Sequence, residues 1–288
     1  MERERSFGRM VWISMLVLFL EAVTVVILVA FHGQTQESPS AGVNSLGVAL
    51  QLFLAIPGAL AGAVVSLLLV LPAVRLSEAL GRRVTGREAW WWVPVVVAAG
   101  CAPLGVLAAL TGVLGPFEAV GTWCAATVLL SVAALFTRVA RKGLFGRILL
   151  RGSLAVLSTG ALGLMALGFG LVDPYAPPVV SHASMVGDWT DGNGGTLTLS
   201  EDGGAVASAV GDPAYDAEDT EGMERCTGRG AWSYDRGEGP WGQTVEVTVP
   251  ECGWQPWEVL GSESRVTLYH YVGDPDSWVL YTLTKAHG

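Results

Sequence analysis

A single carboxyl group lies in the middle of an apolar stretch, where it could handle protons or cations. Glu21 sits within the apolar run Met10–Phe31, and an acidic side chain at the bilayer centre costs about 2.5–3.5 kcal/mol on insertion scales. We expect no Lys or Arg at a comparable depth in another apolar run. The alternative is a protonated Glu21 that bonds to a hydroxyl of the bundle, and we favour it because transporters usually carry several intramembrane ionisable groups. The candidate hydroxyls belong to Thr24, Ser66, Thr127, Ser131, Ser158 and Thr159.

Tryptophan is concentrated in the last third of the chain. The six indoles are those of Trp189, Trp232, Trp241, Trp254, Trp257 and Trp278. One interpretation is an aromatic pocket for a small apolar or sugar ligand, lined by Trp189, Trp232 and Trp278. The other is that the indoles fill a small core and plug its ends, which is the commoner use of buried aromatic side chains.

Two cysteines, Cys226 and Cys252, stand in the same last third of the chain. In an oxidising compartment such a pair is expected to form a disulfide. Closing a 27-residue loop would stabilise the domain by roughly 3–4 kcal/mol in the chain-entropy model. A metal pair is the alternative, but further ligands at suitable spacing are missing. We therefore predict a disulfide, provided that this part of the chain lies outside the membrane.

Catalytic and metal-binding motifs are absent from the sequence. It contains no G-x-S-x-G elbow, Walker A loop, H-E-x-x-H or metal-spaced CxxC, and its four histidines are scattered. His270 lies within a predicted strand and is expected to be structural. The acidic run Asp212–Glu224 departs from a calcium loop, because Glu221 stands where that loop needs Gly and Thr227 where it needs Glu. We expect no enzyme activity, no cofactor and no bound metal.

Composition and charge divide the chain into two parts. Of 288 residues, 51% are apolar and only 15% are charged, which is typical of membrane proteins. Residues 1–180 carry 12 Lys or Arg against 8 Asp or Glu, whereas residues 181–288 carry 5 against 18. The first part suits an anionic membrane surface, and the second is a poor candidate for binding nucleic acid. We therefore expect two domains in two environments, with the lipid bilayer as one partner and no nucleic acid.

Five apolar runs predict a bundle of transmembrane helices in residues 1–172. A run of about 20 apolar residues is long enough to span a bilayer. The runs are residues 10–31, 46–71, 90–113, 120–136 and 148–172. The fourth is the shortest, so the number of spans is least certain there. Ile148–Val172 is the run after which the chain changes from apolar to polar.

Basic residues in the connecting loops predict the orientation of the bundle. All 12 Lys and Arg of this part fall on one side of a five-span arrangement, and the loops His32–Ser45 and Leu114–Ala119 contain none. By the positive-inside rule the N-terminus is cytoplasmic, and an odd number of spans places the last third outside the cell. We expect a multi-pass protein of the plasma membrane.

The last third predicts an all-β domain. Asp173–Ser184 is proline-rich and favours a stiff, extended tether, and residues 185–288 then alternate short apolar–polar stretches with turn signals. The expected strands are Thr196–Ser200, Ala205–Val210, Gly230–Tyr234, Gln243–Val249, Trp257–Leu260, Arg265–Val272 and Trp278–Thr284. Seven or eight short strands at this spacing predict a small antiparallel barrel or sandwich.

Several motifs of the last third resemble a known kind of domain. They are Gly187-Asp188-Trp189, the GGTLTL segment, Gly228–Trp232 and the terminal LYHYVGDPDSWVLYTL. Together they resemble an extracytoplasmic β-domain of actinobacterial membrane proteins and lipoproteins, and the Gly-x-Trp is similar to the lipocalin signature. Arg outnumbers Lys by 15 to 2, which is typical of GC-rich genomes such as those of actinobacteria. The resemblance implies a small lipocalin-like barrel and brings no activity with it.

Two functional hypotheses follow from these patterns. The first is a non-enzymatic membrane protein that displays an acidic, disulfide-closed β-domain for binding a small ligand or an envelope protein. The second is a channel or transporter component that uses Glu21, with the β-domain as a cap.

Overall fold

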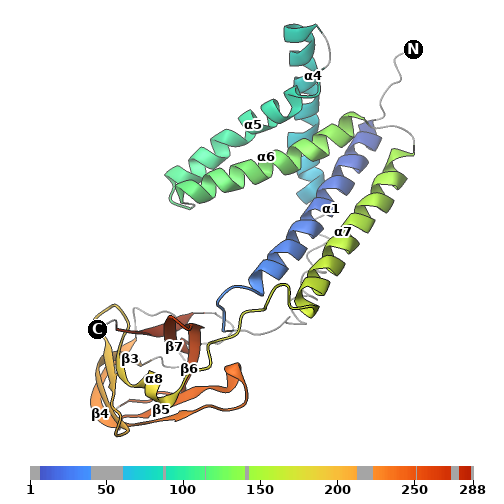
Figure 1. The fold of residues 1–288 in the computed structure, drawn as a ribbon. Coiled ribbons are helices and arrows are strands. Elements are labelled where there is room, and N and C mark those ends of the chain that lie inside the picture. Colours follow the sequence, from blue (N-terminus) through green and yellow to red (C-terminus); the bar gives the residue numbers. More distant parts are fainter. Residues whose placement is uncertain are drawn as a thin grey trace. The chain divides into compact units, whose positions relative to one another are not determined.

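The computed structural model describes residues 7–39, 61–86, 89–113, 115–139, 143–212, 223–250, 252–273 and 279–286. They form two compact units, one of helices and one built around strands (Figure 1). This is the predicted fold class, helices first and an all-β domain second.

Five helices in the described part of the chain are long and apolar enough to cross a membrane. They are α1 (Phe7–Gly33), the helix Ala61–Val84, α5 (Trp92–Leu110), α6 (Pro116–Arg138) and α7 (Leu144–Gly168). The described part of the second helix begins at Ala61. It contains a π-helical turn, η1 (Ser66–Val70), and continues as α4 (Leu71–Thr85).

Helices α4, α6 and α7 differ from the apolar runs by four residues or more at one end at least. α4 extends past Leu71, with Val74 and Ser77 buried and Arg75 exposed. α6 begins at Pro116, where the carboxylate of Glu118 accepts the amide N–H of Gly115 at 3.0 Å and satisfies one free donor of the helix start. Hydropathy alone detects neither polar residues within a helix nor hydrogen bonds at its start. The ends of the apolar runs therefore differ from the ends of these helices.

The end of α7 lies earlier than the end of its apolar run. The chain turns at Gly170, which has a φ of 64°, and the amide of Leu171 donates to the carbonyl of Ala166 at 2.8 Å. A glycine in the left-handed region commonly ends a helix in this way. The helix starts four residues earlier than the run, so it includes Arg147 and carries Arg151 two turns from its start.

The helical unit has its own buried core, to which every one of these helices contributes. The buried residues include Ile13 and Val17 of α1, Val74 of α4, and Val97 of α5. Between α5 and α6, the indole N–H of Trp123 donates to the carbonyl of Ala98 at 3.0 Å. These side chains set the lateral packing of the helices.

Helices α1 and α7 pack through two glycines. A Cβ at Gly152 would collide with Leu20, and a Cβ at Gly163 would collide with the ring of Phe31. The two contacts are eleven residues apart on each helix, about three turns. The helices therefore run parallel in a fixed register, and small residues permit their close approach.

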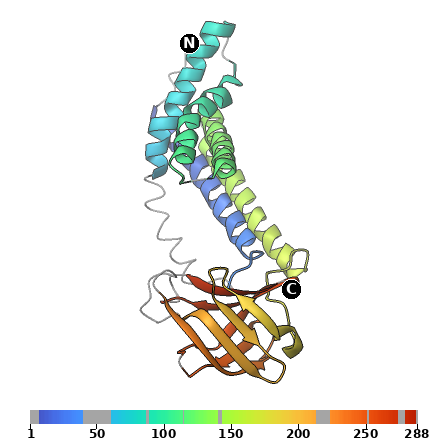
Figure 2. The ribbon, with the colours of Figure 1, turned by 90° about the vertical axis from the view of Figure 1, so that its left-hand side faces the viewer.

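The second unit contains a closed antiparallel barrel of eight strands in sequence order (Figure 2). The strands are β1 (Gly187–Thr190), β2 (Thr196–Leu199), β3 (Gly204–Asp212), β4 (Glu224–Asp235), β5 (Thr244–Thr248), β6 (Trp257–Ser262), β7 (Arg265–Tyr271) and β8 (Leu280–Lys285). Pairing of Trp189 in β1 with Lys285 in β8 closes the ring. An up-and-down barrel of eight strands is compatible with a lipocalin-like module.

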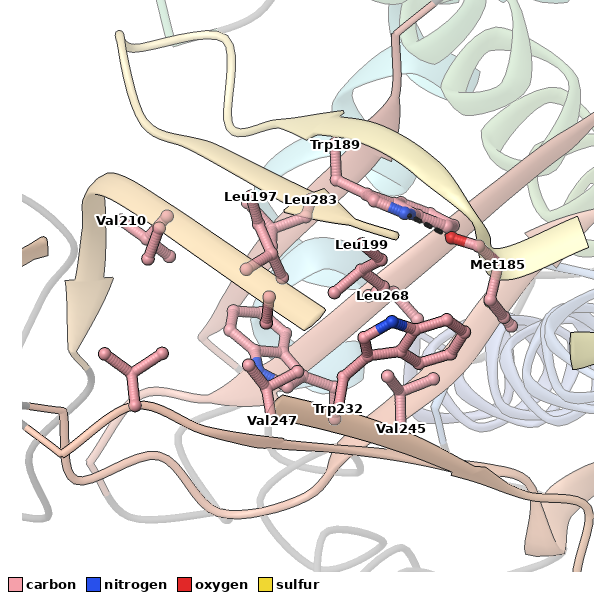
Figure 3. Close-up of a cluster of buried hydrophobic side chains, with 14 of the residues drawn as sticks. Met185, Trp189, Leu197, Leu199, Val210, Trp232, Val245, Val247, Leu268 and Leu283 are labelled. Atoms are coloured by element: carbon pink, nitrogen blue, oxygen red, sulfur yellow. Dashed lines mark hydrogen bonds between the residues drawn. The ribbon is translucent and has the colours of Figure 1, made fainter. Parts of the chain in front are cut away.

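Alternate residues of the strands point into the barrel and form its core. Leu197 and Leu199 of β2, Val245 and Val247 of β5, and Leu268 of β7 are all buried (Figure 3). The period-two pattern of the sequence thus matches the pleat, in which successive side chains point to opposite faces.

The segment predicted as a tether is bound to the barrel. The buried Gln243 side chain donates to the carbonyls of Pro178 and Pro240, and its Oε1 accepts the amide of Val180 at 2.8 Å. The hydroxyl of Tyr175 bonds to both backbone groups of Gly261 in β6 at 2.9 Å. Residues that follow α7 are therefore an integral part of the barrel unit.

The residues that follow α1 belong to the same unit as the barrel. The amide of Tyr175 donates to the carbonyl of Gln34 at 2.7 Å, and Arg265 of β7 lies 3.2 Å from the carboxylate of Glu37. Two separate stretches of chain, one after the first helix and one after the last, thus dock on the barrel.

Candidate functional site

The predicted indole site lies at the end of the barrel that the short helix α8 (His182–Met185) covers. Trp189 is fully buried, and its indole N–H donates to the carbonyl of Met185 at 2.9 Å (Figure 3). Trp232 donates to the carbonyl of Ser200 at 2.9 Å, and the ring of His182 stacks on it at 4.5 Å. Both indoles thus pack within the barrel and have backbone partners.

This packing is what the core-filling interpretation expects of Trp189 and Trp232. Trp278, the third indole of the predicted site, lies outside the described residues. A ligand at these three side chains stays a prediction.

A second aromatic cluster lies inside the barrel, and the sequence did not single it out. Trp257 of β6 and His270 of β7 have ring centroids 3.9 Å apart, and Trp254 meets Trp257 edge-on at 5.9 Å. The indole N–H of Trp257 and Nε2 of His270 are buried and lack hydrogen-bond partners among the described residues. Burial lowers the pKa of His270 from 6.5 to about 4, because it penalises the charged imidazolium.

A buried carboxylate joins three parts of the barrel beside this cluster. Oδ2 of Asp191 accepts from Arg225 of β4 at 2.9 Å and from the hydroxyl of Tyr281 at 2.8 Å, while Oδ1 accepts the amides of Asn193 and Gly195 at 2.7 Å. Burial opposes ionisation of Asp191, but these donors outweigh it and the pKa of the carboxyl is lowered.

Asp191 is not singled out in the sequence analysis. Its partners Arg225 and Tyr281 are 34 and 90 residues away in the chain. No local pattern marks such a contact, so sequence reasoning could not find it.

The Cys226–Cys252 disulfide is confirmed. It connects β4 with the segment before β6, and the two Cα atoms are 5.7 Å apart. Cys226 is buried and Cys252 packs against the barrel core, so the disulfide fixes these two parts of the chain at the core. The described cysteines of the helical unit, Cys101 and Cys124, are free thiols.

Glu21 lines a cavity of about 630 Å³ in the helical unit. Residues of α1, α6 and α7 line it, and α6 and α7 both pack against α1. Most of the lining is apolar, and the polar side chains are Glu21, Thr24, Arg147 and Arg151. This cavity is the candidate functional site, because it brings ionisable groups of two neighbouring helices, α1 and α7, together in an apolar setting.

The expectation that Glu21 has no cation at its depth is wrong. Gly152 packs against Leu20, so Arg151 and Glu21 lie within one turn of the same level on adjacent helices. The sequence gives the position of each residue in its own helix, but the relative shift of two helices depends on their packing.

The predicted hydroxyl partners of Glu21 are not seen in the described part of the bundle. Oε2 of Glu21 is buried and has no hydrogen-bond partner there, and the hydroxyls of Ser66, Thr127 and Ser131 are likewise unpaired. The hydroxyl of Thr24 instead donates to the carbonyl of Leu20 at 2.8 Å.

The described residues contain no group of three or more His, Cys, Asp or Glu side chains arranged to hold a metal ion. Most of the acidic run Asp212–Glu224, residues 213–222, lies outside them. The interpretation that this run is not a calcium loop stays a prediction.

Comparison of the chain with protein family models, with curated proteins and with solved structures finds no match.

Proposed function

We propose that this protein is a non-enzymatic, multi-pass protein of the plasma membrane that presents its β-barrel outside the cell to a partner of the envelope. The observation that carries the proposal is the barrel itself: a disulfide-closed domain, with chain segments from two separate helices docked on it. Disulfides persist in oxidising compartments, which supports a barrel outside the cytoplasm. The distribution of Lys and Arg supports a cytoplasmic N-terminus.

The filled interior favours recognition on the outer surface of the barrel. Side chains such as Trp189, Leu268 and Trp257 occupy the space in which an eight-stranded barrel can hold a small ligand. Residues 181–288 carry 5 basic against 18 acidic side chains, so a partner with a basic surface would be attracted and steered to the barrel. A small apolar or sugar ligand at the indoles is the other form of this proposal.

Reporter fusions after Gly288 test the location of the barrel. Alkaline phosphatase, which requires oxidising conditions, should be active there, and green fluorescent protein exported as an unfolded chain should be dark. The same reporters placed after Arg83 should give the opposite result. A green fluorescent protein fusion at Gly288 that fluoresces would contradict the proposal.

Crosslinking in intact cells tests recognition by the outer surface. A photoreactive residue at Val206, which points outward from β3 and is 42% exposed, should capture an envelope protein, and capture should weaken in high salt. A photoreactive residue at Val128, on the exposed face of α6, is the control for crosslinks that merely report proximity in the membrane. Equal products from both positions would count against recognition by the barrel.

Transport through the helical unit is the second candidate function, and the cavity around Glu21 favours it. Proton or ion flux should then fall in vesicles that contain the Glu21→Gln variant. Flux equal to that of the unchanged protein would exclude this use of the carboxyl.

A further inference from the structure

The cavity beside Glu21 has one charged end and one apolar end. Arg147 and the first turn of α7 lie at the end where α6 finishes with Phe136, and Leu28, Ala155 and Val156 line the opposite end. Along α1 the lining extends from Val17 to Leu28, which is about 16 Å of helix. This is about half of the roughly 30 Å hydrocarbon thickness of a bilayer, so the cavity is long enough to hold part of an acyl chain.

The charges of the cavity do not balance. Arg147 and Arg151 are one turn apart on α7 and both line the cavity, whereas Glu21 is the single acid among its described lining residues. When Glu21 is ionised it offsets one guanidinium, and one positive charge remains. Arg147 and Arg151 are both exposed, so an anion can reach this remaining positive charge, and the charge balance favours a monoanion.

We propose that this cavity binds one anionic phospholipid, with its phosphodiester on Arg147 and Arg151 and an acyl chain along Val25, Leu28 and Val156. Guanidinium groups match phosphate oxygens in charge and geometry. The apolar wall that α6 adds with Leu129 and Val132 suits a hydrocarbon chain, and basic pockets between transmembrane helices are known to bind lipid head groups.

The charged end lies on the side of the bundle that carries the basic residues. α6 ends at Arg138, and Arg147 is in the first turn of α7. In the orientation proposed above this is the cytoplasmic side, whose leaflet is the anionic one. The leaflet depends on that orientation, whereas the phospholipid site depends only on the cavity.

Native mass spectrometry of the full chain in mild detergent tests the site. The probes are phosphatidylglycerol and phosphatidylcholine with identical acyl chains. The unchanged protein should retain phosphatidylglycerol roughly tenfold better, and the Arg147→Gln/Arg151→Gln double variant should lose this preference. The matched control is Arg75→Gln/Arg82→Gln, which removes two exposed arginines of α4 that do not line the cavity. An equal effect of the two double variants, or no preference in the unchanged protein, would overturn the proposal.

Two further variants test separately the charge of the site and its contact with the acyl chain of the lipid. Glu21→Gln removes the acid and should strengthen retention of phosphatidylglycerol several-fold, so weaker or unchanged retention contradicts the charge argument. Ala155→Trp fills the apolar end and should reduce retention of both lipids. If this variant keeps its helical circular dichroism and binds both lipids as before, the cavity does not hold the acyl chain.

Glycerol 3-phosphate distinguishes a lipid site from a plain phosphate site. It carries a phosphate monoester on glycerol and has no acyl chain. It should fail to displace phosphatidylglycerol at millimolar concentration, and displacement would show a phosphate site instead. Failure of the lipid experiments would leave the reporter-fusion result unaffected, so the two proposals are tested separately.

Discussion

The imidazole of His270 lies against the indole of Trp257 inside the barrel, with ring centroids 3.9 Å apart. The two residues come from neighbouring strands, β7 and β6. Only 7% of His270 is exposed, and no described group of opposite charge bonds to it. A titratable group is thus built into an apolar core, where its neutral form is strongly favoured.

The stability of the barrel should therefore fall in mild acid. The unfolded chain binds a proton at His270 near pH 6.5, but the folded barrel does so only near pH 4. As pH falls from 6.5 to 4 the unfolded state is favoured, by about 3 kcal/mol in total. The urea midpoint, followed by near-ultraviolet circular dichroism, should drop over this window. His270→Phe should flatten the dependence, and an unchanged slope in that variant would assign the titration to another group.

The Asp191 network should be one of the costliest polar sites to disrupt. The Asp191 side chain is 1% exposed, whereas that of Arg225 is 43% exposed. Asp191→Ala leaves buried donors unpaired and should destabilise the barrel by about 2–4 kcal/mol. Arg225→Gln should cost about 1 kcal/mol, because solvent can replace an exposed partner. The urea midpoints of the two variants check this order, and equal losses would contradict it.

The Asp191 network adds a second pH dependence. The folded barrel favours the charged form of Asp191, whereas it favours the neutral form of His270. The folded pKa of Asp191 is lowered, so its contribution is present above the unfolded pKa of about 3.9 and is lost as pH falls below it. In the His270→Phe variant, loss of stability should therefore begin only below about pH 4.

Removal of the disulfide should weaken the barrel and leave the helices intact. Cys226→Ser/Cys252→Ser should lower the free energy of unfolding by about 3–4 kcal/mol. The matched control, Cys101→Ser/Cys124→Ser, changes the free thiols of the helical unit and should leave the barrel midpoint unchanged. The intact mass of the barrel should also rise by two hydrogens on reduction. A midpoint that is insensitive to the first variant would mean that the core alone holds this end of the barrel.

Elements whose formation depends on local pattern could be predicted from the sequence. The strands β2 and β5 alternate apolar and polar residues, and their inward side chains are the apolar ones. The helices follow from apolar length. Their ends are less predictable, because residues such as Glu118 and Gly170 set them through single hydrogen bonds or backbone conformation.

Contacts between distant residues could not be predicted in this way. β4 was predicted only from Gly230 on, because the charged residues of Glu224–Arg229 conceal its pattern, and it is this part that carries Arg225 to Asp191. The approach of Arg151 to Glu21 likewise depends on the register of α1 and α7. Both sites are products of tertiary packing.

The two glycine contacts between α1 and α7 should differ in their tolerance of a methyl group. At both Gly152 and Gly163 an added Cβ collides with a side chain of α1. Gly152 meets the end of Leu20, which can rotate away, whereas Gly163 meets the stiff ring of Phe31. Gly163→Ala should cost about 1–3 kcal/mol and Gly152→Ala less. Gly160→Ala is the control, because a Cβ there meets no neighbour within 4 Å. Thermal unfolding of the helices in detergent measures all three. A Gly163→Ala midpoint at or above that of Gly160→Ala would show that the two helices do not pack closely in the membrane protein.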